Sequence, residues 1–312
     1  MRNVLEEWCE VVLDETSPDE MELKAERLRE VEILFSGWGG ARMDERVLSM
    51  MPGLKAVFYS AGSIKHIVTD EFWQRGIPIC SAWAANAVPV AEFTLAQIIL
   101  ALKQVHMASG LLRKERKWVH PEGLKRGGAF GTRVALISLG EIGRRVAGML
   151  KMLEVEVLAY DPFVSDEAAA ALGVKKAGLE ECFENARVVS LHTPWLPETE
   201  GLISGGLIRK MQVGATLINT SRGAVVNEPE MIEVLQERPD ITAVLDVTYP
   251  EPPAPESQLY TLPNVFLTPH IAGSTADECG RLGLYMAEEC RRFLAGEPLV
   301  WSVSREAAQR MA

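Results

Sequence analysis

Short apolar runs rich in valine, isoleucine and leucine alternate with amphipathic segments along most of the chain. In the first part of the chain, strands are expected at residues 31–37, 54–60 and 77–80, and amphipathic helical segments between them at residues 43–51 and 70–76. Two neighbouring strands that are connected through a helix run in the same direction. The alternation therefore predicts a parallel sheet.

A second and longer series follows a helix expected at residues 88–106, which is apolar around most of its circumference and should be buried. Its strands are expected at residues 132–138, 155–161, 186–192, 215–221, 241–247 and 264–270. Six such strands make a complete doubly wound sheet. A last helix over residues 274–296 ends at Gly296, after basic residues in its final turns. The predicted fold class is α/β, with two doubly wound parallel-sheet domains.

Residues 136–143 read LISLGEIG and lead from the first strand of the second series into a helix. Gly140 and Gly143 fit the last two glycines of a G-x-G-x-x-G turn, whose backbone amides approach a pyrophosphate at a helix N-terminus. Ser138 stands where the first glycine is usual, and we expect it to cost at most about 1 kcal/mol in an ordinary backbone conformation. The pattern indicates a dinucleotide-binding turn.

Glu141 stands between the two glycines, where an acid faces a bound pyrophosphate. A carboxylate about 6 Å from a phosphate charge costs roughly 1 to 3 kcal/mol of binding. Alternatively, the acid complements the positive end of the helix, worth about 0.3 to 1 kcal/mol, while Arg144 and Arg145 offset its charge. The two interpretations are compatible, so the effect of Glu141 and of Ser138 on cofactor affinity stays open.

Asp161 ends the second strand of this series, eighteen residues after Gly143. An acid at this distance accepts hydrogen bonds from a ribose diol and repels a 2′-phosphate. The residues that follow are Pro162 and Phe163, so no arginine is at hand to bind the phosphorylated cofactor. The expected cofactor is NAD.

Composition narrows the class of protein further. The chain has 312 residues and a net charge of -11, which disfavours a nucleic-acid partner because nothing would release counterions from a polyanion. The basic segment of residues 113–126 is short and mixed in sign, so we interpret it as a solvated or subunit-contact segment. The five cysteines are far apart without a C-x-x-C pair, which indicates reduced thiols in the cytoplasm and no metal site. The apolar runs are interrupted by polar residues, so we expect no membrane insertion.

Three more segments place chemically active side chains where strands of the second series end. Arg222 follows one strand, Asp246 and Glu251 follow the next, and His270 follows the last. Ligands of open α/β sheets bind beyond the carboxyl ends of the strands, where all of these residues fall.

With residues 86–97 and 190–204, these segments resemble the D-isomer-specific 2-hydroxyacid dehydrogenases. That family includes glyoxylate/hydroxypyruvate reductases, phosphoglycerate dehydrogenases and D-lactate dehydrogenases. The resemblance extends from about Leu54 to the final helix.

The resemblance implies a role for each of these side chains. Arg222 would orient the carboxylate of a 2-oxo acid through its planar guanidinium. His270 would protonate the carbonyl oxygen as hydride arrives, and Glu251 beside it would favour the imidazolium form. Asp246 would hold the nicotinamide carboxamide. The expected activity is that of an NAD(H)-dependent dehydrogenase, working mainly as a 2-oxoacid reductase.

The resemblance also implies two sets of binding residues. Those expected at the cofactor are Gly140, Glu141, Ile142, Gly143, Asp161, His192, Thr193, Pro194, Thr220, Ser221, Arg222, Asp246, His270, Ala272 and Gly273. Those expected at the substrate are Ala61, Gly62, Arg222 and His270. His66, His106 and His120 are expected to be ordinary, partly exposed histidines, whereas Trp38, Trp83 and Trp118 fit either a core or a pocket.

The family architecture implies an NAD-binding domain, residues 101–287, inserted in a flavodoxin-like substrate domain of residues 1–100 and 288–312. It also implies a homodimer through the cofactor domain, with residues 113–126 at the subunit contact. The chain stops at Ala312, which disfavours the allosterically regulated phosphoglycerate type, and Glu251 disfavours the formate-oxidising type, which has glutamine. A non-catalytic, NAD(H)-sensing corepressor is the alternative function. The identity of the 2-hydroxy acid stays open.

Overall fold

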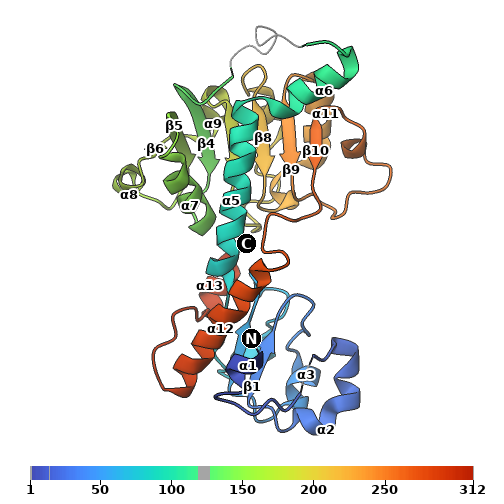
Figure 1. The fold of residues 1–312 in the computed structure, drawn as a ribbon, viewed down its shortest axis with the longest axis vertical. Helices are drawn as coiled ribbons and strands as arrows, with labels where there is room; N and C mark the ends of the chain where they lie inside the picture. Colours follow the sequence, from blue (N-terminus) through green and yellow to red (C-terminus); the bar gives the residue numbers. More distant parts are fainter. Residues whose placement is uncertain (1, 14, 119–126, 312) are drawn as a thin grey trace. The chain divides into compact units, whose positions relative to one another are not determined.

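The structure is a computed structural model that describes residues 2–13, 15–118 and 127–311. The chain forms two compact α/β units, which we call the first unit (Met1–Ala87 and Ser274–Met311) and the inserted unit (Val88–Gly273). Figure 1 shows a parallel sheet with helices packed on it in the inserted unit. The predicted α/β class is confirmed. Residues 119–126 of the expected contact segment, with His120, lie outside the described residues.

The first unit is built on a three-stranded parallel sheet in the order β1-β2-β3, with β1 (Ile33–Ser36), β2 (Ala56–Tyr59) and β3 (Ile79–Ser81). Its helices are α1 (Arg2–Leu5), α2 (Ala25–Leu28), α3 (Glu45–Met50), α4 (Asp70–Gln74), α12 (Glu278–Leu294) and α13 (Arg305–Arg310), with 3-10 turns η1 (Pro18–Glu20) and η2 (Glu22–Lys24). Each expected strand and helix of the first part of the chain is present; all lie within the predicted ranges except β3, which starts two residues later than expected and extends one residue further, to Ser81. Side chains alternate across β2: Val57 and Tyr59 share a core with α3 and α4, whereas Phe58 shares one with α12.

The inserted unit is built on a seven-stranded parallel sheet in the order β10-β9-β8-β7-β4-β5-β6. The strands are β4 (Thr132–Ile137), β5 (Val155–Tyr160), β6 (Lys175–Lys176), β7 (Val188–Leu191), β8 (Thr216–Asn219), β9 (Thr242–Leu245) and β10 (Val265–Leu267). Its helices are α5 (Trp83–Leu102, which begins in the first unit), α6 (Val105–Glu115), α7 (Glu141–Leu150), α8 (Asp166–Ala171), α9 (Leu179–Asn185), α10 (Gly205–Arg209) and α11 (Glu228–Glu237), with 3-10 turns η4 (Gly223–Val225) and η5 (Gln258–Tyr260). All six predicted strands are present. β6 was missed because two residues at a sheet edge show no period.

The strand order reverses between β4 and β7, and helices cover both faces of the sheet. On β4, Val134 and Leu136 pack with α5 and α7, whereas Ala135 and Ile137 pack with α9, α10 and α11. This is the doubly wound arrangement that the near-continuous apolar runs predict, because the central strands β7, β8 and β9 are buried along their whole length. The point of reversal is where such sheets bind ligands.

The helix expected at residues 88–106 is two helices. α5 begins earlier, at Trp83, and α6 follows it after a corner at Gln104, whose backbone has a positive φ of 53°. The left-handed conformation at this residue breaks the helical path. Sequence periodicity does not report the break, because apolar positions continue through it.

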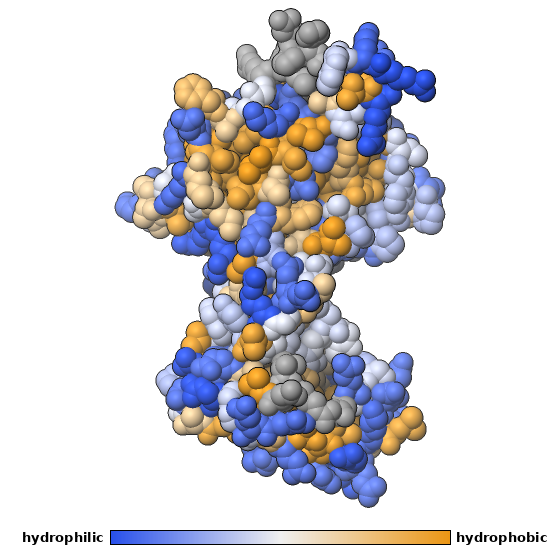
Figure 2. Space-filling model, viewed as in Figure 1, coloured by the Kyte–Doolittle hydropathy of each residue, from blue (hydrophilic) through white to orange (hydrophobic). Residues whose placement is uncertain are grey.

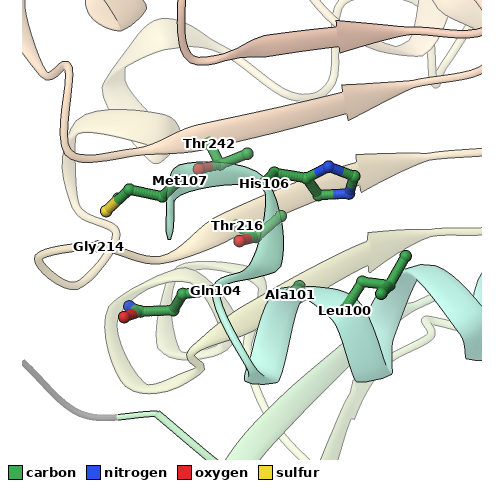
Figure 3. Close-up of a pocket in the computed structure, with 8 residues that line it drawn as sticks. All are labelled: Leu100, Ala101, Gln104, His106, Met107, Gly214, Thr216 and Thr242. Atoms are coloured by element: carbon green, nitrogen blue, oxygen red, sulfur yellow. The ribbon is translucent and has the colours of Figure 1, made fainter. Parts of the chain in front are cut away.

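The α5–α6 corner covers a small pocket, which is lined by Gln104 and His106 and by Thr216 and Thr242 at the starts of β8 and β9 (Figure 3). Its volume of about 10 Å³ is room for about one water molecule. The His106 ring stacks against Phe266 with centroids 4.4 Å apart, and burial lowers the pKa of this histidine. The corner is thus packed against the sheet.

In the described part of the chain, α5 alone is long and apolar enough to cross a membrane by length and composition. Half of its most apolar stretch is buried in the protein. Ala91, Ile98 and Ala101 belong to the core between the sheet and α7. Packing in this core accounts for much of the helix's apolar character.

The boundaries of the two units along the chain differ from those expected. The inserted unit begins at Val88 and not at residue 101, because Ala91 and Ile98 of α5 pack against the larger sheet. It ends at Gly273 and not at residue 287, because α12 buries Leu282 and Met286 against β2 and β3 of the first unit. The whole last helix therefore belongs to the first unit.

Candidate active site

The turn after β4 brings the backbone of α7 close to the strand. A Cβ on Gly143 would lie 2.2 Å from the Ser138 carbonyl oxygen, so only glycine fits there. A Cβ on Gly140, the N-cap residue of α7, would meet nothing within 4 Å. The first amides of α7 therefore border open space beyond β4, as binding of a pyrophosphate requires.

Ser138 has a φ of 82°, in the region that favours glycine. The expectation of an ordinary backbone conformation here is wrong, since the tight turn imposes the geometry of the missing glycine. Its hydroxyl lies 3.2 Å from that of Thr193, in the loop after β7. This hydrogen bond joins the turn to the neighbouring loop across the point of reversal.

Glu141 forms an ion pair with Arg145, one helical turn further along α7, with 2.6 Å between Oε1 and Nη2. Arg144 donates from Nε to the Leu139 carbonyl at 2.7 Å, which ties it to the turn. Glu141 thus stands in the first turn of the helix beside a compensating cation, and the offset of its charge by Arg145 is confirmed. This arrangement reduces the repulsion between Glu141 and a phosphate.

The Asp161 carboxylate is buried at the end of β5 and receives three backbone hydrogen bonds. Leu139 donates at 2.7 Å, and Phe163 and Val164 donate at 2.8 and 3.1 Å. The acid therefore holds the turn after β4 against the loop after β5. Oδ1 accepts two of these bonds and Oδ2 accepts one, so a lone pair of Oδ2 is left to accept from a ribose.

His192 ends β7 and is buried beside Gly143. Burial lowers the pKa of His192 to about 4, so the ring is neutral near pH 7. Its Nε2 lies 3.1 Å from the Ser190 hydroxyl, whereas its buried Nδ1 has no hydrogen-bond partner among the described residues. A buried polar atom of this kind, next to the turn, fits a site that a ligand completes.

The loop after β8 is held by Asn219, which sequence analysis missed. Its Oδ1 accepts from the backbone and hydroxyl of Ser221 at 3.0 and 2.8 Å, and its Nδ2 donates to the Arg222 carbonyl at 3.0 Å. The hydroxyl of Thr220 lies 2.9 Å from that of Thr94 on α5, another buried residue that was missed. Asparagine at a strand end is a common turn signal, and it could have identified Asn219.

Gly223 makes the closest approach in the site. A Cβ there would lie 2.0 Å from the carbonyl carbon and oxygen of Thr248, in the loop after β9. The loops after β8 and β9 therefore touch backbone to backbone, which brings Arg222 beside Glu251. A glycine directly after the arginine was the only sequence signal for this contact.

Arg222 is partly buried, and its Nη1 donates to the Ser221 carbonyl at 2.6 Å. Burial lowers the pKa of the guanidinium, and the nearby Glu251 carboxylate acts in the opposite direction. A partly desolvated guanidinium interacts strongly with a second anion, which makes Arg222 suited to a carboxylate ligand.

His270 and Glu251 form a hydrogen-bonded pair with 2.6 Å between Nδ1 and Oε1. Both side chains are exposed, at 47% and 41%. With Nδ1 directed at the carboxylate, the free Nε2 is the atom available for proton transfer. The sequence-predicted pair is therefore brought together.

Asp246 fixes the loop that carries His270. Its buried carboxylate accepts from the Thr268 hydroxyl at 2.6 Å and from the amides of Ile271 and Ala272 at 2.9 and 2.8 Å. Its own carbonyl accepts from the His270 amide at 2.9 Å, where His270 has a positive φ of 52°. Asp246 is thus a positioning residue for His270. This role was not predicted from the sequence, which suggested only a contact with the nicotinamide carboxamide.

The remaining predicted residues divide between the two units. In the inserted unit, Ile142 and Pro194 are partly buried, and Gly273 ends the unit after the buried Ala272. In the first unit, the carbonyls of Ala61 and Gly62 accept from the Ser81 hydroxyl. The expected contact of these two residues with the substrate stays a prediction.

The family model described as "D-isomer specific 2-hydroxyacid dehydrogenase, NAD binding domain" matches residues 95–272, more than half of the chain. The chain belongs to this family. The match falls within the inserted unit, which is therefore the NAD-binding domain, and NAD is the cofactor.

Relatives within the 2-hydroxyacid dehydrogenase family agree with this assignment. A D-3-phosphoglycerate dehydrogenase from Archaeoglobus fulgidus is 34% identical over 260 residues, which cover 83% of this chain and 49% of the relative. The chain thus spans about half the length of the curated relatives that it matches.

Solved structures agree on the fold. A crystal structure of a protein from Thermus thermophilus has a TM-score of 0.76 at 29% identity and covers 93% of this chain and 91% of the other. A D-lactate dehydrogenase with NAD+ from Lactobacillus jensenii has a TM-score of 0.79 at 23% identity and covers 94% and 91%.

Proposed function

We propose that this protein is an NAD(H)-dependent D-2-hydroxyacid dehydrogenase that works as a 2-oxoacid reductase. The observation that carries the proposal is the arrangement of Arg222, Glu251 and His270 in the NAD-binding domain. They follow three adjacent strands, with a 2.6 Å hydrogen bond between the acid and the histidine and with the arginine beside the acid. A guanidinium, a carboxylate and an imidazole, in this order, supply the groups that carbonyl reduction needs.

The residues of the turn fit a dinucleotide. Open space at Gly140, the close packing at Gly143 and the unpaired Nδ1 of His192 lie at the point where the strand order reverses. Amides of α7 would hold the pyrophosphate, and Asp161 would accept from the ribose. When bound, NADH supplies the hydride for C2 of the 2-oxo acid.

His270 supplies and removes the proton. Its Nδ1 stays with Glu251, so in the imidazolium form Nε2–H donates a proton to the carbonyl oxygen during reduction. In the neutral form the same Nε2 accepts a proton from the hydroxyl during oxidation. The Glu251 charge stabilises the imidazolium, and Asp246 holds the loop that orients the ring.

Arg222 orients the substrate. Its guanidinium, held at Ser221 and partly desolvated, would bind the 2-oxo acid carboxylate through two parallel hydrogen bonds. An orienting contact of this type contributes through position, because the reacting carbon must lie within about 3 to 3.5 Å of the hydride donor.

A panel of 2-oxo acids tests the proposal. NADH oxidation is followed by the loss of its near-ultraviolet absorbance with glyoxylate, hydroxypyruvate, pyruvate and bulkier 2-oxo acids, for the wild type and for His270→Asn. We expect turnover with at least one acid, preference for NADH over NADPH, and a loss of about 10²- to 10⁴-fold in kcat for the variant. NADH binding without turnover on any acid would instead favour the sensor function.

We also infer that the protein is a homodimer through α5 and α6. In α6 no described residue is buried, and helices as short as its 11 residues are marginal in water without a packing partner. Ile99, Val105 and Leu112 on these helices are 40 to 42% exposed. Figure 2 shows apolar surface on the face of the NAD-binding domain that carries α5. A second copy supplies a matching apolar face through two-fold symmetry.

A further inference from the structure

A recess of about 450 Å³ lies beside the catalytic pair in the NAD-binding domain. Its walls come from β10, the loops after β9 and β10, and η5. No residue of the turn after β4, or of the loops after β7 and β8, lines it. The sheet order places β10 at the outer edge, so the recess borders the pair from the edge side, away from the cofactor turn. Arg222 is not among its lining residues.

The walls of the recess are mainly apolar. Pro252, Pro253, Leu267 and Pro269 line it, together with Tyr260. The Tyr260 hydroxyl donates to the Pro253 carbonyl at 3.1 Å, which holds the ring although the residue is 52% exposed. A volume of this size, with apolar walls and an aromatic ring, is typical of a small-molecule site.

The polar lining of the recess includes two carboxylates, Asp246 and Glu251, beside Thr248, Thr268 and His270. Asp246 uses its carboxylate for the three hydrogen bonds of the His270 loop. Glu251 is 41% exposed, and only its Oε1 is bonded to His270. In the described part of the chain, its Oε2 has no hydrogen-bond partner, which leaves one carboxylate oxygen for a ligand. No lysine or arginine lines the recess.

We propose that this recess is a second binding site, for a small organic ammonium with an aromatic or alkyl body. Its N–H would donate to Glu251 Oε2, its charge would lie near the Tyr260 ring, and its body would contact the prolines and Leu267. An anion is disfavoured because two carboxylates, Glu251 and Asp246, face it against one imidazole, His270, which already pairs with Glu251. The bound ammonium and His270 would share one carboxylate.

Occupancy of the recess has a consequence for turnover, which rests on the proposed function. An ammonium on Glu251 would share the carboxylate that holds the His270 ring through Nδ1, and so would loosen the contact that orients the proton donor. The ligand would therefore lower kcat at saturating NADH and 2-oxo acid, without competing with either. The binding itself does not depend on the proposed chemistry.

Binding is tested with phenethylammonium and its neutral analogue 2-phenylethanol, by calorimetric titration and saturation-transfer NMR in saturating NADH. We expect the ammonium to bind at least fivefold more tightly than the alcohol. Tyr260→Ala should weaken it about tenfold, whereas Tyr260→Phe, which keeps the ring, should bind within twofold of the wild type. Glu251→Gln should reduce the ammonium to the affinity of the alcohol.

Equal binding of the ammonium and the alcohol would overturn the proposal, as would undiminished binding to Tyr260→Ala. The kinetic arm is separate: the ammonium should lower kcat in the wild type, and the inhibition should weaken in Tyr260→Ala in step with binding. If no 2-oxo acid is turned over, the proposed function fails while the titrations still decide the recess.

Discussion

At the scale of single residues, Ser138 shows how the turn after β4 is made without its first glycine. Its φ of 82° is a conformation that costs a residue with a Cβ of the order of 1 to 3 kcal/mol. Its hydroxyl recovers part of this through the 3.2 Å hydrogen bond to Thr193. Serine is tolerated because the two effects oppose each other.

Two substitutions separate these effects. Ser138→Ala removes the hydrogen bond and keeps the strain, whereas Ser138→Gly removes both. We expect the glycine variant to be more stable than the alanine variant by about 1 kcal/mol, because the relief of strain exceeds the greater chain entropy of glycine. Urea unfolding monitored in the NAD-binding domain measures the difference. Equal stabilities would mean that the turn holds Ser138 without strain.

His192 makes stability depend on pH. Its pKa of about 4 in the folded protein lies below the ordinary value of 6.5, so the unfolded chain binds the proton more readily. The free energy of unfolding that the neutral His192 ring contributes is fully present above pH 6.5 and is lost as the pH falls toward 4. Between pH 6.5 and 5 the expected loss is about 2 kcal/mol, at 1.36 kcal/mol per pH unit. His192→Gln should lack this loss, which unfolding curves at the two pH values would show. A parallel loss in both proteins would place the titration elsewhere.

At the scale of elements, the site depends on one backbone contact between two loops. Gly223, after β8, lies against Thr248, after β9, with no space for a Cβ. Gly223→Ala must push the loops apart and move Arg222 away from its position beside Glu251. We expect about 1 to 3 kcal/mol of lost stability and a loss of about 10²-fold in kcat/KM.

The matched control is Gly148→Ala on α7, where an added Cβ meets nothing within 4 Å. This exposed helical site should gain about 0.5 to 1 kcal/mol and keep its activity. Full activity of Gly223→Ala would show that the loops can separate without moving the arginine.

Much of the fold could be predicted at this scale, because buried parallel strands are apolar on both faces and stand out in the sequence. The catalytic candidates were found because they follow strand ends in segments that resemble the family's motifs. The corner at Gln104 was not predicted, since its cause is a backbone angle at a residue with no turn signature. Thr94 was missed because its partner, Thr220, is brought near only by the fold, whereas Asn219 was missed although its partners are two and three residues along the chain. The boundary expected within α12, at residue 287, was wrong because the sequence does not show which sheet the apolar face of this helix packs on.

At the scale of the whole molecule, the net charge of -11 opposes self-association, so a dimer needs an apolar contact. The exposed side chains Ile99, Val105 and Leu112 provide one on α5 and α6. Ile99→Asp places a charge on this apolar surface. Leu284→Asp on α12, where the side chain is 57% exposed, is the matched control in the first unit.

We expect sedimentation equilibrium to give twice the 34.4 kDa chain mass for the wild type and for Leu284→Asp. Ile99→Asp should dissociate at micromolar concentration, because a buried unpaired carboxylate costs several kcal/mol in each of two symmetric positions. Its α6 should also lose amide protection in hydrogen exchange, since a helix of this length is marginal once its apolar face returns to water. A monomeric wild type whose α6 amides are still protected would contradict the dimer. Packing within the chain would then stabilise α6.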